Sequence, residues 1–503
     1  MADVKITFKN YTYAQVHADT GIMLELRDYF SFVMDGARFN PKFKYSGWDG
    51  KIRLLDGNGN LPIGLVDQLI KYCSQNMMEI DVDEKLKPVH QISESEFDEW
   101  LNSMSIKSNG ENITPHWYQR DAVFQGLNGN RRTLNLPTSA GKSLIACLLS
   151  RYYIENYEGK VLILVPSTTL VNQMIDDFDD YTLIPKHACH GIMAGTAKHT
   201  DKLIVVSTWQ SACKMSSDWF QQFGMIIVDE CHGATAKEIG KIVNCMTHCQ
   251  FKFGMSGSLR DGKANILQYV GMFGSIFKPV STAQLIEEGA VSDLKINSIF
   301  LRYPENDIIL TKGVDYQAEI KHITEHTKRN SWICRLALKL SDTTAKNENT
   351  LILFRLKKHG KLLYEALEKK HNGKVIFIDG DTKTIERSAA KIETENGDGI
   401  IIVASYGVLS TGVSIKKLHH VIFAHPIKSK VTVLQSIGRV LRKHKTKDKA
   451  QLWDIVDNLC VETKRKTAKK KYSHQNYAYK HGIERLERYI SEKFEFTQKD
   501  VNL

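Results

Sequence analysis

The feature that most constrains this chain is a series of short apolar segments that alternate with helical segments, and the series occurs twice. This alternation is typical of βαβ units around a parallel sheet. The first series predicts strands at Leu134–Leu136, Val161–Val165, Leu203–Ser207, Met225–Val228 and Phe253–Met255. The second predicts strands at Thr350–Phe354, Lys374–Ile378, Gly399–Ala404 and His420–Ala424. Two consecutive series imply two α/β lobes, divided near residues 285–330.

Two further zones flank the lobes. Residues 1 to about 83 mix short β-like runs with an aromatic and basic segment, and a polar, acidic stretch follows at about 81–110. After Val456 the chain becomes strongly basic and then predicts an amphipathic helix, which is either a solvated tail or a functional basic run. We therefore predict an α/β fold with a small α+β N-terminal domain at 1–105, lobes at 112–290 and 291–458, and a basic helical tail at 459–503.

The composition favours a polyanionic partner, but only weakly. The 503 residues include 68 Lys plus Arg against 57 Asp plus Glu, which gives a formal net charge of +11. Many proteins with such an excess bind no polyanion, so the charge supports a nucleic-acid partner only together with other signals.

The nine cysteines contain no CxxC pair, which is typical of a reducing compartment. Two His/Cys groups lack the paired spacing of a zinc site, so zinc is not predicted. They are His187, Cys189 and His190, and Cys245, His248 and Cys249. The N-terminus has no apolar core of signal-peptide length, and no segment approaches the roughly 20 apolar residues that cross a bilayer. We expect a cytoplasmic protein without membrane contact.

A candidate phosphate-binding loop runs from Leu136 to Ser143, between a predicted strand and a predicted helix. Backbone N–H groups, the positive end of a helix and a cation together suit a polyphosphate. Gly141 lets the loop approach closely, Lys142 supplies the cation, and Ser143 can hold Mg²⁺. The first glycine of the usual pattern is replaced by Leu136, so a chance turn remains an alternative for this loop alone.

A pair of carboxylates, Asp229 and Glu230, follows the predicted strand Met225–Val228. Phosphoryl transfer needs Mg²⁺ to neutralise developing charge and a group that orients the attacking water. We expect Asp229 to hold the Mg²⁺ and Glu230 to position and deprotonate the water. Adjacent acids at a strand end can be merely solvated, but a phosphate loop in the same lobe favours catalysis.

From Pro115 to Arg442 the motifs and their order resemble those of superfamily 2 helicases of the DExH type, and in particular branch-migrating recombination helicases of phages. The matching segments are Tyr118–Arg120 (adenine recognition), Val165–Gln173 and Val206–Gln210 (strand contacts), Asp229–His232 (the DExH box), Ser256–Ser258 (coupling), Ser410–Ser414 (motif V) and Gln435–Arg442 (motif VI). Ser139 and Thr411 depart from the common pattern.

The resemblance implies two RecA-like lobes that use ATP and Mg²⁺. It assigns residues to the nucleotide at Gln119, Thr138, Ser139, Ala140, Gly141, Lys142, Ser143 and Gly412. It assigns coupling to His232, Ser256 and Ser258, and strand contacts to Ser167, Thr168, Thr208 and Gln210. Arg439 and Arg442 are then candidates to stabilise the γ-phosphate from the second lobe, the alternative being surface ion pairs.

The N-terminal aromatic and basic segment is a candidate for a junction or a splayed strand. It contains Lys42, Phe43, Lys44, Tyr45, Trp48, Lys51 and Arg53, which combine positive charge with stacking surfaces. The alternative is an ordinary small β-rich domain with a Gly-Trp-Asp-Gly turn.

We therefore predict an ATP-dependent DNA helicase or translocase. From the resemblance we expect it to act on forks, Holliday junctions and R-loops in recombination, repair and replication restart. The expected partners are branched or single-stranded DNA and RNA–DNA hybrids, and the expected state is a monomer. A restriction-type translocation subunit is one alternative, although the chain shows no evident nuclease acid-and-lysine cluster beyond the motor. Two others stay open at this point: first an RNA helicase with the same motor, and second a non-catalytic annealing or binding protein. Intact Lys142, Asp229, Glu230 and Arg442 speak against the second.

Overall fold

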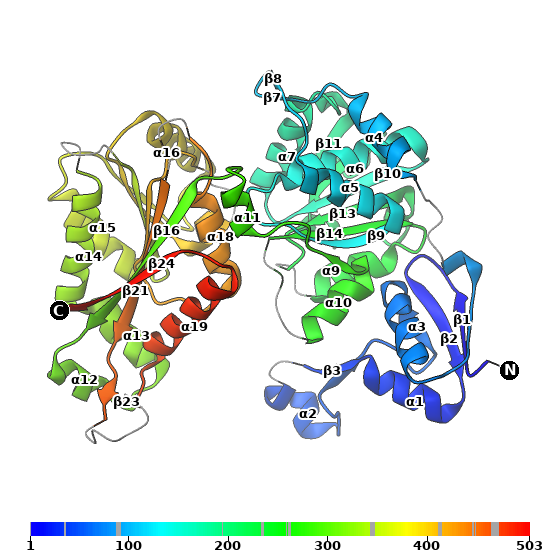
Figure 1. Cartoon of the computed structure of the whole chain (residues 1–503), viewed down its shortest axis with the longest axis horizontal. Helices are drawn as coiled ribbons and strands as arrows, with labels where there is room; N and C mark the ends of the chain where they lie inside the picture. Colours follow the sequence, from blue (N-terminus) through cyan, green and yellow to red (C-terminus); the bar gives the residue numbers. More distant parts are fainter. Residues whose placement is uncertain are drawn as a thin grey trace. The chain divides into compact units, whose positions relative to one another are not determined.

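The computed structural model describes residues 2–34, 37–86, 92–193, 195–232, 236–257, 259, 263–342, 348–410, 415–444, 447, 449–463 and 472–503. They form two compact units (Figure 1). The first holds residues 1–136 and 140–279, and the second holds residues 137–139 and 280–503. None of the helices in the described ranges combines the length and apolar character that spanning a bilayer requires.

The first unit begins with a small mixed sheet in the order β5-β2-β1-β6. Alternate residues of its strands, such as Val4 and Ile6, are buried with residues of α1 and α3 in one apolar cluster. A two-stranded ribbon, β3 with β4, flanks α2. The elements are β1 (Val4–Phe8), β2 (Tyr13–Ala18), α1 (Thr20–Tyr29), β3 (Ser31–Val33), α2 (Pro41–Tyr45), β4 (Lys51–Arg53), β5 (Asn60–Pro62), α3 (Val66–Gln75) and β6 (Ile80–Val82).

The first large sheet has seven parallel strands in the order β11-β12-β10-β13-β14-β9-β15. Its elements are α4 (Glu94–Asn102), the ribbon β7 (Lys107–Ser108) and β8 (Glu111–Asn112), α5 (Trp117–Gly129), β9 (Arg131–Asn135), α6 (Lys142–Asn156), β10 (Lys160–Val165), α7 (Thr168–Asp180), β11 (Cys189–Ile192), β12 (Ile204–Thr208), α8 (Trp209–Ala212), β13 (Phe223–Asp229), α9 (Ala236–Cys245), β14 (Phe251–Ser256), α10 (Lys263–Phe273) and β15 (Ile276–Phe277).

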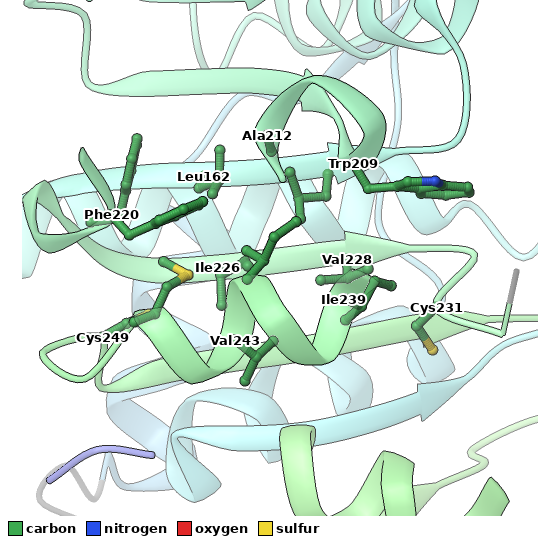
Figure 2. Packing of buried hydrophobic residues seen from close by; sticks show 14 of the residues in the cluster. Leu162, Trp209, Ala212, Phe220, Ile226, Val228, Cys231, Ile239, Val243 and Cys249 are labelled. Carbon is green, nitrogen blue, oxygen red and sulfur yellow. The ribbon is translucent and has the colours of Figure 1, made fainter. Parts of the chain in front are cut away.

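Burial explains why the central strands of this sheet are continuous apolar runs. Every residue of β12 and of β14 is buried, as expected for a parallel sheet covered on both faces. Figure 2 shows Leu162, Ile226 and Val228 of the strands in one cluster with Ile239 and Val243 of α9. Cys249, one of the residues considered for zinc, lies in the same apolar cluster.

The second unit contains another seven-stranded parallel sheet, in the order β18-β19-β17-β20-β21-β16-β24. Its elements are α11 (Thr282–Glu287), β16 (Asp293–Arg302), α12 (Glu305–Thr311), α13 (Tyr316–Glu325), α14 (Thr327–Leu340), β17 (Thr350–Phe354), α15 (Lys357–Glu368), β18 (Val375–Ile378), α16 (Thr384–Asn396), β19 (Ile401–Ser405), α17 (Tyr406–Ser410), β20 (His420–Phe423), α18 (Lys430–Val440), β21 (Lys449–Asn458), β22 (Val461–Glu462), β23 (Tyr472–His474), α19 (Tyr477–Ser491) and β24 (Phe496–Asn502).

The predicted fold class, two parallel-sheet lobes after a small N-terminal domain of helices and strands, is confirmed. The segment 459–503, predicted as a basic helical tail, contains the helix α19, and after it β24 pairs in parallel with β16 at the edge of the second sheet. The sequence of β24, FTQKDVN, is mostly polar and its residues are largely exposed, so it lacks the apolar pattern by which the inner strands were recognised. The basic runs at 464–466 and 469–471 lie outside the described residues.

The N-terminal sheet is fused to the first large sheet rather than tethered beside it. Leu267 of α10 is part of the apolar cluster of the N-terminal sheet. Tyr11 N–H donates to the carbonyl of Thr247 at 3.0 Å, and Lys252 Nζ on β14 donates to Thr12 Oγ1 at 2.9 Å. Residues 1–105 therefore lie in the same compact unit as the first large sheet.

Candidate nucleotide-binding site

The candidate site lies at the carboxyl edge of the first large sheet. β13, β14 and β9 are neighbours in the sheet and run parallel, so their C-terminal ends lie side by side. β9 leads into the phosphate loop, β13 ends at Asp229, and β14 ends at Ser256. Ligands of open parallel sheets bind at this edge.

Two residues of the phosphate loop have a left-handed backbone. Gly141, the N-cap of α6, has φ 77°, and a Cβ there would lie 2.2 Å from Gln119 Nε2. Ser139 has φ 72°, a conformation that favours glycine and explains why glycine is frequent at this position of the pattern. The loop delivers the backbone N–H groups of the first turn of α6 to an anion.

Gln119 is buried and fixes the loop to the start of α5. Its Oε1 accepts from His116 N–H, and its Nε2 donates to the carbonyl of Ala140, both at 2.9 Å. The structure therefore gives Gln119 a loop-holding contact in addition to the adenine contact that the resemblance implies.

Lys142 and Glu230 face each other, with Nζ 3.4 Å from Oε1. Burial alone would raise the pKa of Glu230, but the charge of Lys142 and the contacts of His232 outweigh it and lower that pKa below its usual range. Burial, reinforced by the charge of Glu230, raises the pKa of Asp229. Glu230 is thus the carboxylate that ionises first, as a general base requires.

Asp229 has a buried carboxylate oxygen, Oδ1, without a hydrogen-bond partner among the described atoms. Because an unpaired buried carboxylate oxygen is costly, this environment fits a group that is completed by a cation.

The DExH box contacts the end of β14 through His232. Its Nδ1 lies 2.6 Å from Ser256 Oγ and 3.2 Å from Glu230 Oε2. Ser256 Oγ donates to Glu230 Oε2 at 3.4 Å. The three residues thus form one cluster that joins the DExH box to the end of β14.

Tyr181, which was not predicted, contacts the phosphate-binding helix. Its hydroxyl lies 2.9 Å from Ser143 Oγ. Burial raises the pKa of Tyr181 well above its usual range, so the hydroxyl stays protonated. No sequence signal indicates this residue, because it lies at the C-terminus of α7, 38 positions after Ser143.

The predicted strand contacts differ in exposure. Thr168 and Gln210 are exposed, and Ser167 is half-buried. Thr208 is buried, and its hydroxyl accepts from Ser211 N–H as the cap of α8. The strand contact of Thr208 stays a prediction, and its hydroxyl also caps a helix.

In the N-terminal segment, Lys42 and Lys44 of α2 are exposed. Phe39 and Tyr45 beside them are 86% and 85% exposed, which is unusual for aromatic side chains of this size. Trp48 is half-buried, and its Nε1 donates to the carbonyl of Lys51. The segment thus presents charge and aromatic faces together.

Several predicted residues are not tested by these contacts. Ser258, Gly412 and the side chain of Arg439 lie outside the described part of the chain. Arg442 follows α18 in the second unit, where its carbonyl accepts from Ser292 Oγ at 3.4 Å.

The first lobe has a phosphate loop after β9 and paired acids after β13. The second lobe repeats the sheet architecture and carries motif VI between β20 and β21. Together these features define a superfamily 2 helicase. Comparison with known proteins agrees. Residues 3–83 match the family model "DNA helicase UvsW, N-terminal", residues 94–261 match "Type III restriction enzyme, res subunit", and residues 328–444 match "Helicase conserved C-terminal domain".

The chain is 52% identical to the ATP-dependent DNA helicase uvsW of Enterobacteria phage T4, over 100% of both chains. The crystal structure of T4 UvsW matches 99% of each chain with a TM-score of 0.54. A structure of Saccharomyces cerevisiae Dbp5 bound to RNA and ADP BeF3 is similar in fold, with 14% identity, a TM-score of 0.53, and coverage of 77% of this chain and 90% of that chain. The chain belongs to the UvsW helicase family and is an ATP-hydrolysing helicase.

Proposed function

We propose that this helicase is an ATP-driven DNA translocase that remodels forks, Holliday junctions and R-loops in recombination, repair and replication restart. The observation that carries the proposal is the exposed segment around α2, with Lys42 and Lys44 between Phe39 and Tyr45. The domain that bears it shares its core with the ATP-binding lobe. Because the α2 segment is fixed to one lobe, it would move with that lobe during each ATP cycle. The T4 relative is itself described as a DNA helicase.

We assign the nucleotide to Gln119 and to the loop residues Thr138, Ser139, Ala140, Gly141, Lys142 and Ser143. Ser143 and Asp229 would hold Mg²⁺, which supplies charge neutralisation for the transferred phosphoryl group. Glu230 Oε1, held ionised beside Lys142, accepts the proton of the attacking water. His232 and Ser256 would couple changes at Glu230 to movement of β14.

Arg439 and Arg442 are proposed to stabilise the γ-phosphate, so that closure of the lobes depends on ATP. Arg442→Ala should leave ATP binding nearly unchanged and lower turnover by about a thousandfold. Nucleotide binding by fluorescence and turnover by phosphate release measure the two separately. Equal turnover in variant and parent would remove Arg442 from the mechanism.

We propose that Ser167, Thr168 and Gln210 contact the phosphates of the tracked strand without reading bases. Lys42, Lys44 and the Trp48 segment would contact the junction. The helicase would then act as a monomer, with specificity for branch shape rather than for sequence.

The decisive experiment compares substrates. ATPase stimulation and unwinding are measured on a synthetic Holliday junction, a fork, linear duplex, single-stranded DNA and RNA, with Lys142→Ala as the inactive control. Stimulation mainly by RNA would favour an RNA helicase, and no turnover with any polynucleotide would favour a non-catalytic binding protein.

Point substitutions test the α2 segment better than deletion of the N-terminal domain, because deletion would expose Leu267. Phe39→Ala with Tyr45→Ala should lower junction unwinding by roughly tenfold through lost stacking, while stimulation by linear single strands is kept. Lys42→Glu with Lys44→Glu should act in the same direction. Lys369→Glu with Lys370→Glu, two exposed lysines after α15, is the matched control. Unchanged junction preference in both test pairs would contradict the assignment.

A further inference from the structure

A cluster of metal-binding side chains lies in the second unit, on elements that carry none of the residues assigned to ATP or nucleic acid. It consists of Asp307 on α12, His322 on α13 and His326 between α13 and α14. One ligand atom of each lies within 4.8 Å of the others. His322 Nε2 is 3.1 Å from Asp307 Oδ1, and His326 Nε2 is 3.4 Å from Asp307 Oδ2.

The local fold explains how the three residues meet. His322 and His326 are four positions apart across the C-terminal end of α13, a spacing that places two side chains on one helix face. α12 packs against α13 and brings Asp307 to that face (Figure 1). The cluster borders a pocket of about 370 Å³, which leaves room for water ligands.

His322 distinguishes the cluster from a simple ion pair. Its Nε2 is buried and makes no hydrogen bond among the described atoms, although Asp307 Oδ1 is only 3.1 Å away. The two atoms are therefore adjacent, but no N–H bond of His322 points at the carboxylate oxygen. A cation between them satisfies both lone pairs, and an imidazole with a carboxylate suits divalent transition metals.

Coordination of a metal ion by His326 has a free-energy cost. The Nδ1 of His326 accepts from Arg329 N–H at 3.2 Å as the cap of α14, which places the proton of the neutral ring on Nε2. Coordination through Nε2 moves that proton to Nδ1 and gives up the cap, a loss of about fivefold in affinity.

We propose that Asp307, His322 and His326 bind one divalent transition-metal ion of the zinc class, with water in the remaining positions. The ion would cross-link α12 to the junction of α13 and α14. Tyr303 forms an aromatic wall beside it, with its ring centroid 4.9 Å from that of His326. The hydroxyl of Tyr303 donates to Asp457 Oδ1, a buried partner of Arg329, so the wall is held by the core of the unit.

The test uses full-length, tag-free protein without nucleotide, titrated with Co²⁺ and followed by visible absorbance, and with Zn²⁺ by calorimetry. Asp307→Asn and His322→Gln remove a ligand from partly exposed positions. His326→Asn removes the imidazole but retains a good helix cap. His187→Ala, an exposed histidine of the first unit, is the control.

We expect one equivalent bound in the parent and the control, weakened by more than about 100-fold in each of the three ligand variants. Zn²⁺ should also raise the melting temperature of the parent and the control but not of those variants. An equivalent that persists in all three variants, or a parent with no Co²⁺ spectrum, would overturn the proposal.

Discussion

At the residue scale, the candidate catalytic groups could be picked out because each lies in a short contiguous motif. Lys142 follows a glycine at the start of a helix, Asp229 ends an apolar strand, and Glu230 follows it. Contacts between residues far apart in the chain could not be predicted in this way. Tyr181 meets Ser143 only because α6 and α7 pack together, and neither position indicates the other.

Tyr181→Phe tests this contact. Ser143 would lose the partner that orients its hydroxyl, so the Mg²⁺ concentration for half-maximal nucleotide binding should rise about fivefold. Binding of a fluorescent ADP analogue without Mg²⁺ should be unchanged, which a general structural defect would not allow. Tyr153→Phe on α6, whose hydroxyl donates to the carbonyl of Glu158, serves as the control. A Mg²⁺ midpoint equal to that of the parent would show that Tyr181 has no positioning role.

At the element scale, the inner strands were predicted except β16 and β21, and of the four edge strands only β18 was predicted. β17 begins and ends where the apolar run does, whereas β11, β15 and β24 at the sheet edges carry partly exposed residues and a weaker pattern. α19 was predicted from its amphipathic pattern, but its attachment was not. Arg485 on α19 forms a fully buried ion pair with Asp454 on β21, and charged residues of this kind are usually expected at the surface.

Arg485→Ala should destabilise the second unit by about 3–5 kcal/mol, because it leaves the carboxylate of Asp454 buried without its partner. Arg302→Ala breaks a largely exposed pair with Asp500 and should cost less than about 1 kcal/mol. Urea unfolding of both variants followed by circular dichroism compares them directly. Similar losses in the two variants would mean that burial does not decide the strength of these pairs.

At the scale of the whole molecule, the N-terminal domain is joined to the first lobe by a buried lysine. Lys252 Nζ donates to Thr12 Oγ1 and to the carbonyl of Met246 at 3.0 Å. Burial first, and the charge of Arg131 second, lower the pKa of Lys252 well below its usual range. The folded protein thus holds this amine in its neutral form over a pH range in which the unfolded chain is protonated.

This difference has a definite sign. Between the lowered pKa of the folded state and the ordinary lysine pKa of about 10.4, the unfolded state binds up to one proton more than the folded state, so Lys252 makes stability rise with pH by up to about 1.4 kcal/mol per unit. Lys252→Met removes the titrating group. The stability of the parent relative to the variant should therefore increase between pH 7.5 and about pH 9.5, as measured by urea unfolding.

Lys241→Met, which removes an exposed lysine from α9, should instead give a pH profile parallel to that of the parent. If the Lys252→Met profile is also parallel, Lys252 is charged in the folded protein, and the expectation of a neutral amine at this position is wrong.

The sequence alone determined the two parallel-sheet lobes, the order of the helicase motifs, and the residues at the ends of the inner strands. Periodicity and contiguous motifs encode those properties locally, and the tertiary packing is consistent with them. Tertiary structure alone decided the polar edge strand β24, the fusion of the N-terminal sheet through Leu267 and Lys252, and the Asp307–His322–His326 cluster. Each of these depends on contacts between segments whose own patterns are weak, so only the folded chain brings them together.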